Sequence, residues 1–278
     1  METGSADTFF KEYTSQDAIT KYTRARAGYG ISYLLDHDYK AVYDEALGLL
    51  PQDVRKAGIR ILEFGCGGGM NLLHLVSVLN QDSVRVEKAI GTDFSPVLIE
   101  AAKREVKNYL PEKDWGRVEF YVAKNETLID DLSLASGLEK SKLMNSMHFI
   151  LGVNTIRYCH RAKKQLDCAR DIADLLVPGG VGVVIDMNDR FPFFRSAVKN
   201  RLLGRPETEE CRLPSLNDYT EPFRLAGLDV LRSEHFCWIP HSSGQLMCTV
   251  LSGLSPILNA IARSRAMRSL VVLRKPAA

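Results

Sequence analysis

Short apolar runs rich in β-branched residues alternate with helical patterns from Gly58 onward, and this alternation constrains the fold more than any other feature. It is typical of βαβ units that build a parallel sheet. Strands are predicted at residues 59–64, 86–92, 118–122, 148–153, 181–186, 228–233 and 270–273, and helices near residues 71–80, 96–110, 163–176 and 215–226. The sequence therefore predicts an α/β fold: a seven-stranded, mostly parallel Rossmann-like sheet with helices on both faces.

Three segments interrupt the alternation. Residues 1–50 carry a largely helical pattern, and residues 187–214 and 234–268 separate strands. Structureless loops of this length are uncommon in compact domains. We therefore expect an N-terminal helical cap over residues 1–50, and a domain over residues 51–278 with cap-forming insertions at 187–214 and 234–268. The cap should close over one end of the sheet, because its six tyrosine rings need an apolar surface.

The clearest motif is a strand that breaks into glycines and then a helix. Phe64 is followed by Gly65-Cys66-Gly67-Gly68-Gly69, and the helical pattern starts near Asn71. Glycine is needed where the backbone turns tightly and a ligand approaches the main chain. A plain turn between strand and helix is the alternative. A nicotinamide fingerprint would place its third glycine at Met70, which argues against NAD.

A second motif lies at the end of the next strand. Asp93 and Phe94 precede Ser95-Pro96, which reads as the start of a helix. A carboxylate at this position can accept both hydrogen bonds from a ribose diol, and Phe94 can face an adenine. The alternative for Asp93 is a cap on the helix that follows.

Together the two motifs resemble the class I S-adenosylmethionine-dependent methyltransferases of the small-molecule type, over about residues 58–186. Glu63-x-Gly65-x-Gly67-x-Gly69 looks like the first motif of that family, whose glycines surround the methionine part of the cofactor. The resemblance implies that S-adenosyl-L-methionine is bound by Glu63, Gly65, Cys66, Gly67, Gly69, Asn71, Asp93, Phe94, Asn125, Glu126 and Asn154. Where the family has an acidic residue near the adenine, this chain has Lys124 or Asn125, and we favour Asn125.

The segment after the fourth strand is the place for catalytic groups. Ligands bind outside the carboxyl ends of strands at the switch point of an open α/β sheet. Arg157, Tyr158 and His160 are therefore expected near the transferred methyl. A hydroxyl or amine acceptor needs a base, and His160 suits this role with an ordinary pKa of about 6.5. His160 can instead be a surface or capping histidine, and Tyr158 can be core. Arg157 can either bind an acidic substrate or neutralise a nearby carboxylate.

The additions are expected to supply the pocket walls. The candidate substrate residues are Tyr22, Tyr29 and Tyr33 in the cap and Phe236, Trp238 and His241 in the last insertion. After them, apolar residues recur at spacings of three and four, which predicts one apolar helical face. We expect it to pack on the sheet edge or on a subunit partner, and a lid over the site is the alternative. Its members are Leu246, Met247, Val250, Leu251, Leu254, Ile257, Leu258 and Ile261.

Charge and cysteine usage exclude several kinds of partner. The chain has 36 Lys+Arg and 34 Asp+Glu, a formal charge of +2, which gives no overall field for nucleic acid or a membrane. No run of 18 apolar residues occurs, so we expect no spanning helix, while local basic clusters leave peripheral membrane contact open, and a homo-oligomer also stays open. The cysteines lack C-x-x-C spacing, so no metal site is expected. The amino-terminal segment resembles no signal peptide, so we expect a cytoplasmic protein.

We therefore expect an S-adenosylmethionine-dependent methyltransferase that acts on a small, largely apolar acceptor, such as a natural-product, quinone or lipid-like metabolite. A cofactor-binding regulatory or scaffold protein with the same fold is one alternative. A tRNA or protein methyltransferase is another, less favoured because no Asn-Pro-Pro-aromatic motif occurs. Whether oxygen, nitrogen or carbon is methylated stays open.

Overall fold

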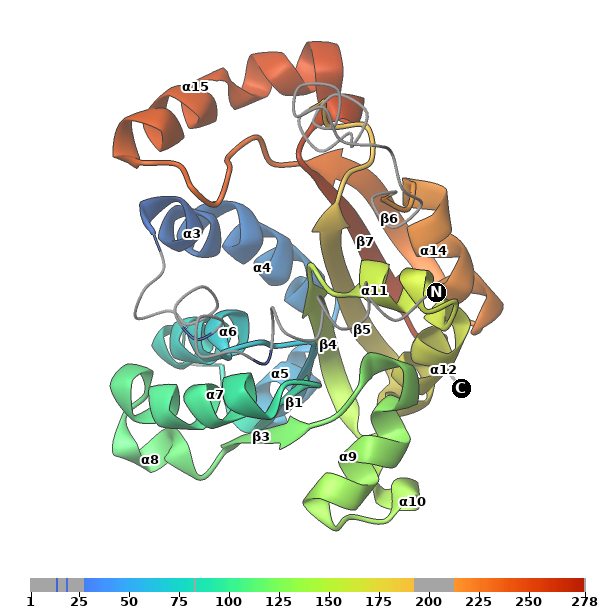
Figure 1. Ribbon diagram of the computed structural model, residues 1–278. Helices are drawn as coiled ribbons and strands as arrows, with labels where there is room; N and C mark the ends of the chain where they lie inside the picture. Colours follow the sequence, from blue (N-terminus) through green and yellow to red (C-terminus); the bar gives the residue numbers. More distant parts are fainter. Residues whose placement is uncertain (1–13, 15–18, 20–27, 83, 193–212, 278) are drawn as a thin grey trace.

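A single seven-stranded sheet crosses the protein in the order β3-β2-β1-β4-β5-β7-β6 (Figure 1). The computed structural model describes residues 14, 19, 28–82, 84–192 and 213–277. The first five strands of that order pair in parallel, while β7 runs antiparallel to both β5 and β6. The strands are β1 (Ile59–Phe64), β2 (Val86–Asp93), β3 (Val118–Val122), β4 (Met147–Val153), β5 (Leu176–Met187), β6 (Asp229–Phe236) and β7 (Arg268–Arg274). The predicted fold class is confirmed.

Helices cover both faces of the sheet, because successive strand residues point to opposite faces. Ile59 and Ile61 of β1 pack with one set of helices, while Leu62 and Phe64 pack with the other. The first face carries α4 (Lys40–Gly48), α6 (Met70–Gln81) and α7 (Pro96–Tyr109). The second carries α9 (Leu128–Ser136), α10 (Lys140–Leu143), α11 (Ile156–Arg161), α12 (Gln165–Leu175) and α14 (Leu216–Leu225). Short helices α5 (Gln52–Ala57), α8 (Glu112–Trp115) and η3 (Asn125–Thr127) lie in connections.

The β5 strand starts earlier than predicted. The strand predicted at residues 181–186 begins at Leu176, directly after α12 ends at Leu175, and it includes Pro178, Gly179 and Gly180. The main-chain N–H of Gly179 donates to the carbonyl of Lys275, and the Lys275 N–H donates to Gly180. Pairing with the end of the chain therefore draws these residues into the strand, which bulges against β4.

The amino-terminal segment is part of the main core as well as a cover. It forms α3 (Tyr29–Leu34), a π-helical turn η2 (Leu35–Tyr39) and α4. Tyr43 is 1% exposed and meets Phe149 of β4 edge to face, with ring centroids 6.4 Å apart. Leu35, Ala46 and Leu50 belong to the same buried cluster as β1, β4 and β5. Residues 34–50 thus complete the sheet's first face, whereas residues 1–13, 15–18 and 20–27 lie outside the described part.

The last insertion forms the long helix α15 (Gln245–Ala262), followed by the short turn η5 (Arg263–Arg265). Most of it is exposed, so it does not pack its apolar face on the sheet edge as expected; a subunit partner is not tested. By length and composition alone, the 21-residue segment Gln245–Arg265 could cross a membrane. Its most apolar window of 18 residues has a mean hydropathy of 1.4, and 6% of that window is buried. The absence of an uninterrupted apolar run of 18 residues therefore does not exclude a spanning helix by length, as was expected, because Ser, Thr, Gly and Asn interrupt the apolar run without adding charge.

Candidate active site at the carboxyl ends of β1, β2 and β4

The glycine turn joins the end of β1 to the segment that follows β4. Gly65, Gly67 and Gly69 have φ values of 63°, 54° and 78°, a left-handed backbone that other residues rarely adopt. A Cβ on Gly65 would lie 2.0 Å from Oγ1 of Thr155. The turn therefore needs glycine both for its conformation and for its close approach to the β4 segment.

Asp93 ties the ends of β1 and β2 together. Its Oδ2 accepts from the Gly67 N–H and its Oδ1 from the Ser95 N–H, both at 2.9 Å. The cap of α7 is Ser95, whose Oγ accepts from the Leu98 N–H at 3.3 Å. Asp93 is 6% exposed, and burial raises its pKa to about 6 although the two hydrogen bonds oppose this shift. The carboxylate thus keeps acceptor capacity beside the glycine turn, since each oxygen has a second lone pair.

Glu63 fixes the start of α6 rather than facing solvent. It is fully buried, and it accepts from the Asn71 amide at 3.1 Å and from the Leu72 N–H at 2.9 Å. Burial raises its pKa to about 8. Two predicted cofactor residues, Glu63 and Asn71, therefore bind each other, and Glu63 acts on the turn through the helix it holds.

The adenine candidates lie in the connection after β3. The Asn125 amide donates to Oγ1 of Thr155 at 2.6 Å, which brings Asn125 to the same edge as the glycine turn. The backbone N–H of Lys124 donates to Asp131, and the Lys124 residue is exposed. Glu126 and Phe94 are half-buried. Asn125 is thus linked to the turn through Thr155, a residue that the sequence analysis did not single out.

Arg157 is neutralised within the protein. Its Nη1 lies 2.6 Å from Oδ1 of Asp186, which is fully buried at the end of β5, and its backbone N–H donates to Oδ2 of the same residue at 3.1 Å. Its Nη2 also donates to the Tyr158 hydroxyl at 2.7 Å. Of the two roles left open for Arg157, the geometry supports neutralisation of a nearby carboxylate.

His160 packs against α14. Its ring meets Tyr219 edge to face with centroids 5.7 Å apart, and Nε2 is buried with no hydrogen-bond partner among the described residues. Burial lowers its pKa, while Asp218 and Asp186 partly oppose the shift. Tyr219 and Asp218 belong to α14, and Asp186 belongs to β5. The predicted base is therefore a half-buried histidine that packs against Tyr219, and burial makes its ring harder to protonate.

A second polar cluster, the Arg268 cluster, lies beneath the amino-terminal cap and consists of Arg268, Asn154, His241 and Tyr39. Arg268, 3% exposed at the start of β7, donates to Oδ1 of Asn154 at 3.2 Å, and its Nη2 lies 2.9 Å from Nε2 of His241. The Tyr39 hydroxyl lies 3.4 Å from the same Nε2. Burial, Arg268 and Arg157 together lower the pKa of His241 to about 3, and burial raises that of Tyr39 to about 12. His241 is thus neutral, and its Nε2 accepts from Arg268.

The Arg268 cluster contains two predicted site residues, Asn154 and His241. Its other two members, Arg268 and Tyr39, were not predicted at the site. Asn154 and Arg268 are 114 positions apart, and Tyr39 and His241 are 202 apart. Asn154 also has a positive φ of 57°, the conformation in which it turns out of β4. No local pattern could have joined these residues, because the sheet order alone places β4 and β7 on either side of β5.

The predicted substrate residues divide into separate groups. Phe236 meets Tyr39 with ring centroids 6.3 Å apart, next to the Arg268 cluster. Trp238 instead donates from Nε1 to Asn259 of α15 at 2.8 Å, and Tyr33 stacks on His37 at 4.0 Å. Tyr29 is 47% exposed. Tyr22 lies outside the described residues.

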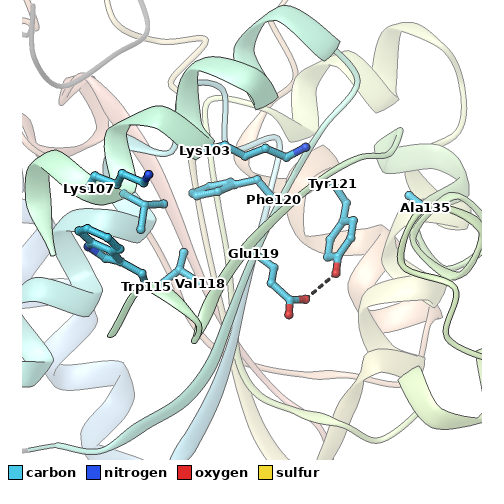
Figure 2. A pocket seen from close by; sticks show the side chains of 9 residues that line it. Lys103, Lys107, Trp115, Val118, Glu119, Phe120, Tyr121 and Ala135 are labelled. Atoms are coloured by element: carbon cyan, nitrogen blue, oxygen red, sulfur yellow. Dashed lines mark hydrogen bonds between the residues drawn. The ribbon is translucent and has the colours of Figure 1, made fainter. Parts of the chain in front are cut away.

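A surface hollow lies along the edge strand β3 (Figure 2). Residues of α7, α8, β3 and α9 line it, and the Tyr121 hydroxyl donates to Glu119 within it at 2.5 Å. None of the predicted site residues lines this hollow. Phe120, which lines the hollow, also connects it to the glycine turn, since its ring packs against Gly69 and Gly91.

Within the described residues no group of three His, Cys, Asp or Glu could hold a metal ion.

Comparisons with known proteins agree with the resemblance to methyltransferases that the sequence motifs indicate. A family model described as a methyltransferase domain matches residues 35–233. The citrinin polyketide synthases of Monascus ruber and Monascus purpureus are each 29% identical over 136 residues, 49% of this chain. That match spans only 4% of the length of those synthases.

Two solved structures share the fold at low identity. The CMeT domain of the citrinin polyketide synthase has a TM-score of 0.59 at 16% identity, covering 97% of this chain and 60% of that one. The CurJ carbon methyltransferase has a TM-score of 0.56 at 15% identity, covering 96% and 61%. The family match spans most of the chain, including the glycine turn, Asp93 and the β4 segment. The chain therefore belongs to the methyltransferase-domain family and has the class I fold of the S-adenosylmethionine-dependent methyltransferases.

Proposed function

We propose that this protein transfers a methyl group from S-adenosylmethionine to a small, largely apolar organic acceptor. The observation that carries the proposal is the junction at one sheet edge of the glycine turn, Asp93 and Asn154, with the Arg268 cluster directly beyond Asn154. A cofactor held at the turn would thus face an acceptor held at the cluster.

The residues at the turn suit the cofactor. Residues 65–69 would hold its methionine part, Asp93 its ribose and Asn125 its adenine. Burial raises the pKa of the two carboxyls nearby, to about 8 for Glu63 and about 6 for Asp93. A cationic ligand is favoured in such surroundings. When bound, S-adenosylmethionine supplies an electrophilic methyl on its sulfonium.

The Arg268 cluster suits the polar end of the acceptor. The guanidinium carries a fixed positive charge in a buried place, where it would stabilise an acceptor oxygen that becomes anionic. Neutral His241 would orient Arg268 rather than remove a proton, because its pKa of about 3 makes it a weak base. Phe236 and Tyr39 would contact the apolar body of the acceptor and exclude water.

This arrangement favours a carbon nucleophile flanked by an oxygen. An enolate carries its charge on oxygen, so Arg268 would stabilise it once the proton on the reacting carbon has passed to a water molecule. The carbon would then form a bond to the methyl as the methyl–sulfur bond breaks, which leaves S-adenosylhomocysteine. The similar proteins support this reading, since their names are those of a polyketide synthase and a carbon methyltransferase. An acyl chain or an aromatic polyketide of small size fits the acceptor class best.

The experiment measures binding of S-adenosylhomocysteine by calorimetry. Gly67→Val should abolish binding, since a branched side chain would strain the left-handed turn and fill the space that the ligand needs. Gly116→Val is the matched control, because Gly116 has a φ of −70° and no atom within 4 Å of its Cβ position. Unchanged affinity in a folded Gly67→Val protein would remove the assignment.

Turnover assays then identify the acceptor class. Methyl transfer should occur on oxygenated carbon nucleophiles and related small apolar acceptors. Binding without any turnover across hydroxylated, aminated and β-ketoacyl acceptors would favour the regulatory alternative. Exclusive activity on RNA or on a folded protein would exclude a small-molecule acceptor.

A further inference from the structure

The helix α15 has no role in the site described above, and its composition is unusual. Its 18 residues contain no Asp, Glu, Lys or Arg, yet the helix stands on the outside of the protein (Figure 1). Among its residues only Cys248 is buried. Exposing a long uncharged helix to water is costly, so its outer surface needs an apolar environment.

The exposed apolar side chains form a single stripe. At about 100° per residue, they fall within an arc of about 100° around the helix axis. The adjacent face, with Cys248, Leu251 and Leu258, turns toward the protein and meets α3 through Tyr33 and Leu34. The stripe and its exposed fractions are Leu246 79%, Met247 51%, Val250 48%, Leu254 43%, Ile257 59% and Ile261 75%.

The segment that contains the helix carries basic and no acidic side chains. Residues 235–267 contain no Asp or Glu, and their two basic side chains are Arg263 and Arg265. Arg263 and Arg265 follow the last turn of α15 and are exposed. Arg263 also forms an ion pair with Glu234 of β6, which fixes the end of the helix to the sheet. The apolar stripe therefore ends at a fixed position on the sheet, with the exposed cation of Arg265 beside it.

Both ends of α15 are held on the same side of the protein. Phe236, the last residue of β6, pairs with Arg268, the first residue of β7. Between them, the loop before the helix packs on α3: a Cβ on Gly30 would lie 2.6 Å from the Pro240 carbonyl oxygen. Trp238 of this loop is hydrogen-bonded to Asn259 near the other end of α15. A helix held in this way lies along a surface rather than across a bilayer.

We propose that α15 docks the protein on an anionic membrane surface, lying in the interfacial plane with its stripe among the acyl chains. The stripe gives apolar area, and Arg263 and Arg265 lie at the level of the lipid phosphates. The charge pattern selects this occupant, because a basic, acid-free segment is complementary to anionic lipid, whereas a second copy of the same segment would repel it. The proposal goes beyond methyl transfer and does not depend on it.

Sedimentation of the full chain with lipid vesicles tests the docking. We expect binding to vesicles of phosphatidylcholine with phosphatidylserine and markedly weaker binding to phosphatidylcholine alone. The double substitution Leu254→Glu and Ile257→Glu should lower the partition coefficient by at least about tenfold. Leu134→Glu is the matched control, because Leu134 is 85% exposed on α9, far from α15 in Figure 1, and should leave binding unchanged.

Two further readouts separate the outcomes. Trp238 should shift its fluorescence to shorter wavelength on vesicle addition in a Trp115→Phe background, since these are the two tryptophans of the chain. Arg265→Gln should weaken binding about fivefold to anionic vesicles only. A folded wild-type protein that ignores vesicles, or a folded double variant that binds as well as wild type, overturns the proposal. So does a dimer in vesicle-free solution that the double variant abolishes, because the stripe would then be a subunit interface.

Discussion

At the scale of single residues, the candidate site contains two buried carboxyl groups, Glu63 and Asp93, whose pKa values are raised by burial. Asp93 is held by two backbone N–H groups, yet its pKa is raised to about 6 because burial outweighs them. A protonated carboxyl loses acceptor capacity toward a ribose diol. The charge state of Asp93 should therefore control cofactor affinity near neutral pH.

We expect the affinity for S-adenosylhomocysteine to rise with pH through about 6, where Asp93 ionises, and any further rise near pH 8 to come from Glu63. The ligand favours the ionised carboxylate, so protons compete with it below the pKa, by up to about tenfold per pH unit. Calorimetry between pH 5 and 8 measures this profile. Asp93→Asn should bind about 10- to 150-fold more weakly above pH 7 and lose the dependence near pH 6, while any contribution from Glu63 near pH 8 remains. A wild-type profile in this variant would exclude Asp93.

The two site histidines differ in what they contact. His160 packs on Tyr219, whereas His241 accepts from Arg268. We expect His160→Gln to change kcat less than about tenfold, and His241→Ala to lower kcat/KM for the acceptor about 10- to 150-fold through the loss of a charged hydrogen bond. Cofactor affinity should be unchanged in both. A fall of about 10²–10⁴ in kcat for His160→Gln, with normal acceptor KM, would restore His160 as general base.

The proximity of the glycine turn to Asp93 could be predicted from the sequence, and the Arg268 cluster could not. Residues 65–69 and Asp93 lie at the ends of neighbouring strands, so a strand, a turn and a helix suffice to bring them together. Arg268 and Tyr39 reach Asn154 and His241 only through the whole sheet and the amino-terminal cover. Burial then sets the charge of His241, a property that its sequence neighbours do not reveal.

At the scale of elements, the strand cores follow the predicted runs closely. The periodicity of β-branched residues predicts β1 and β3 with their observed bounds. Helices α9 and α11, of nine and six residues, were not predicted, since short segments give little periodic signal. The apolar face of α15 was predicted, but periodicity does not say which environment covers a face.

The β4 strand depends on a residue without a side chain. Gly152 lies opposite Phe64 of β1, and a Cβ there would come within 2.2 Å of the Phe64 ring. We expect Gly152→Ala to lower the free energy of unfolding by about 1–3 kcal/mol, because the ring cannot move freely in a packed core. Urea unfolding measures the change. Gly116→Ala is the control, since its Cβ would meet no atom within 4 Å; equal effects of both substitutions would contradict the packing argument.

At the scale of the whole molecule, the amino-terminal segment has two roles. Tyr39 belongs to the Arg268 cluster, while Tyr43 and Leu47, one and two turns later, are buried in the core against the sheet. The sequence indicates a helical cover through its tyrosines, but it cannot show that the same helix also fills the first face. Site and core are therefore built by one continuous helical segment.

This dual role predicts that the cover cannot be removed without loss of the fold. A chain that starts at Leu49 would lose Tyr43, Ala46 and Leu47 and leave Phe149 of the central strand β4 facing water. We expect it to lack a cooperative thermal transition by circular dichroism. The milder substitution Tyr43→Ala should retain a transition but lose about 3–5 kcal/mol of stability, as for other buried aromatic rings. If the shortened chain instead unfolds cooperatively and only its turnover is lost, the segment is a separable cap over the site, and the core must close without it.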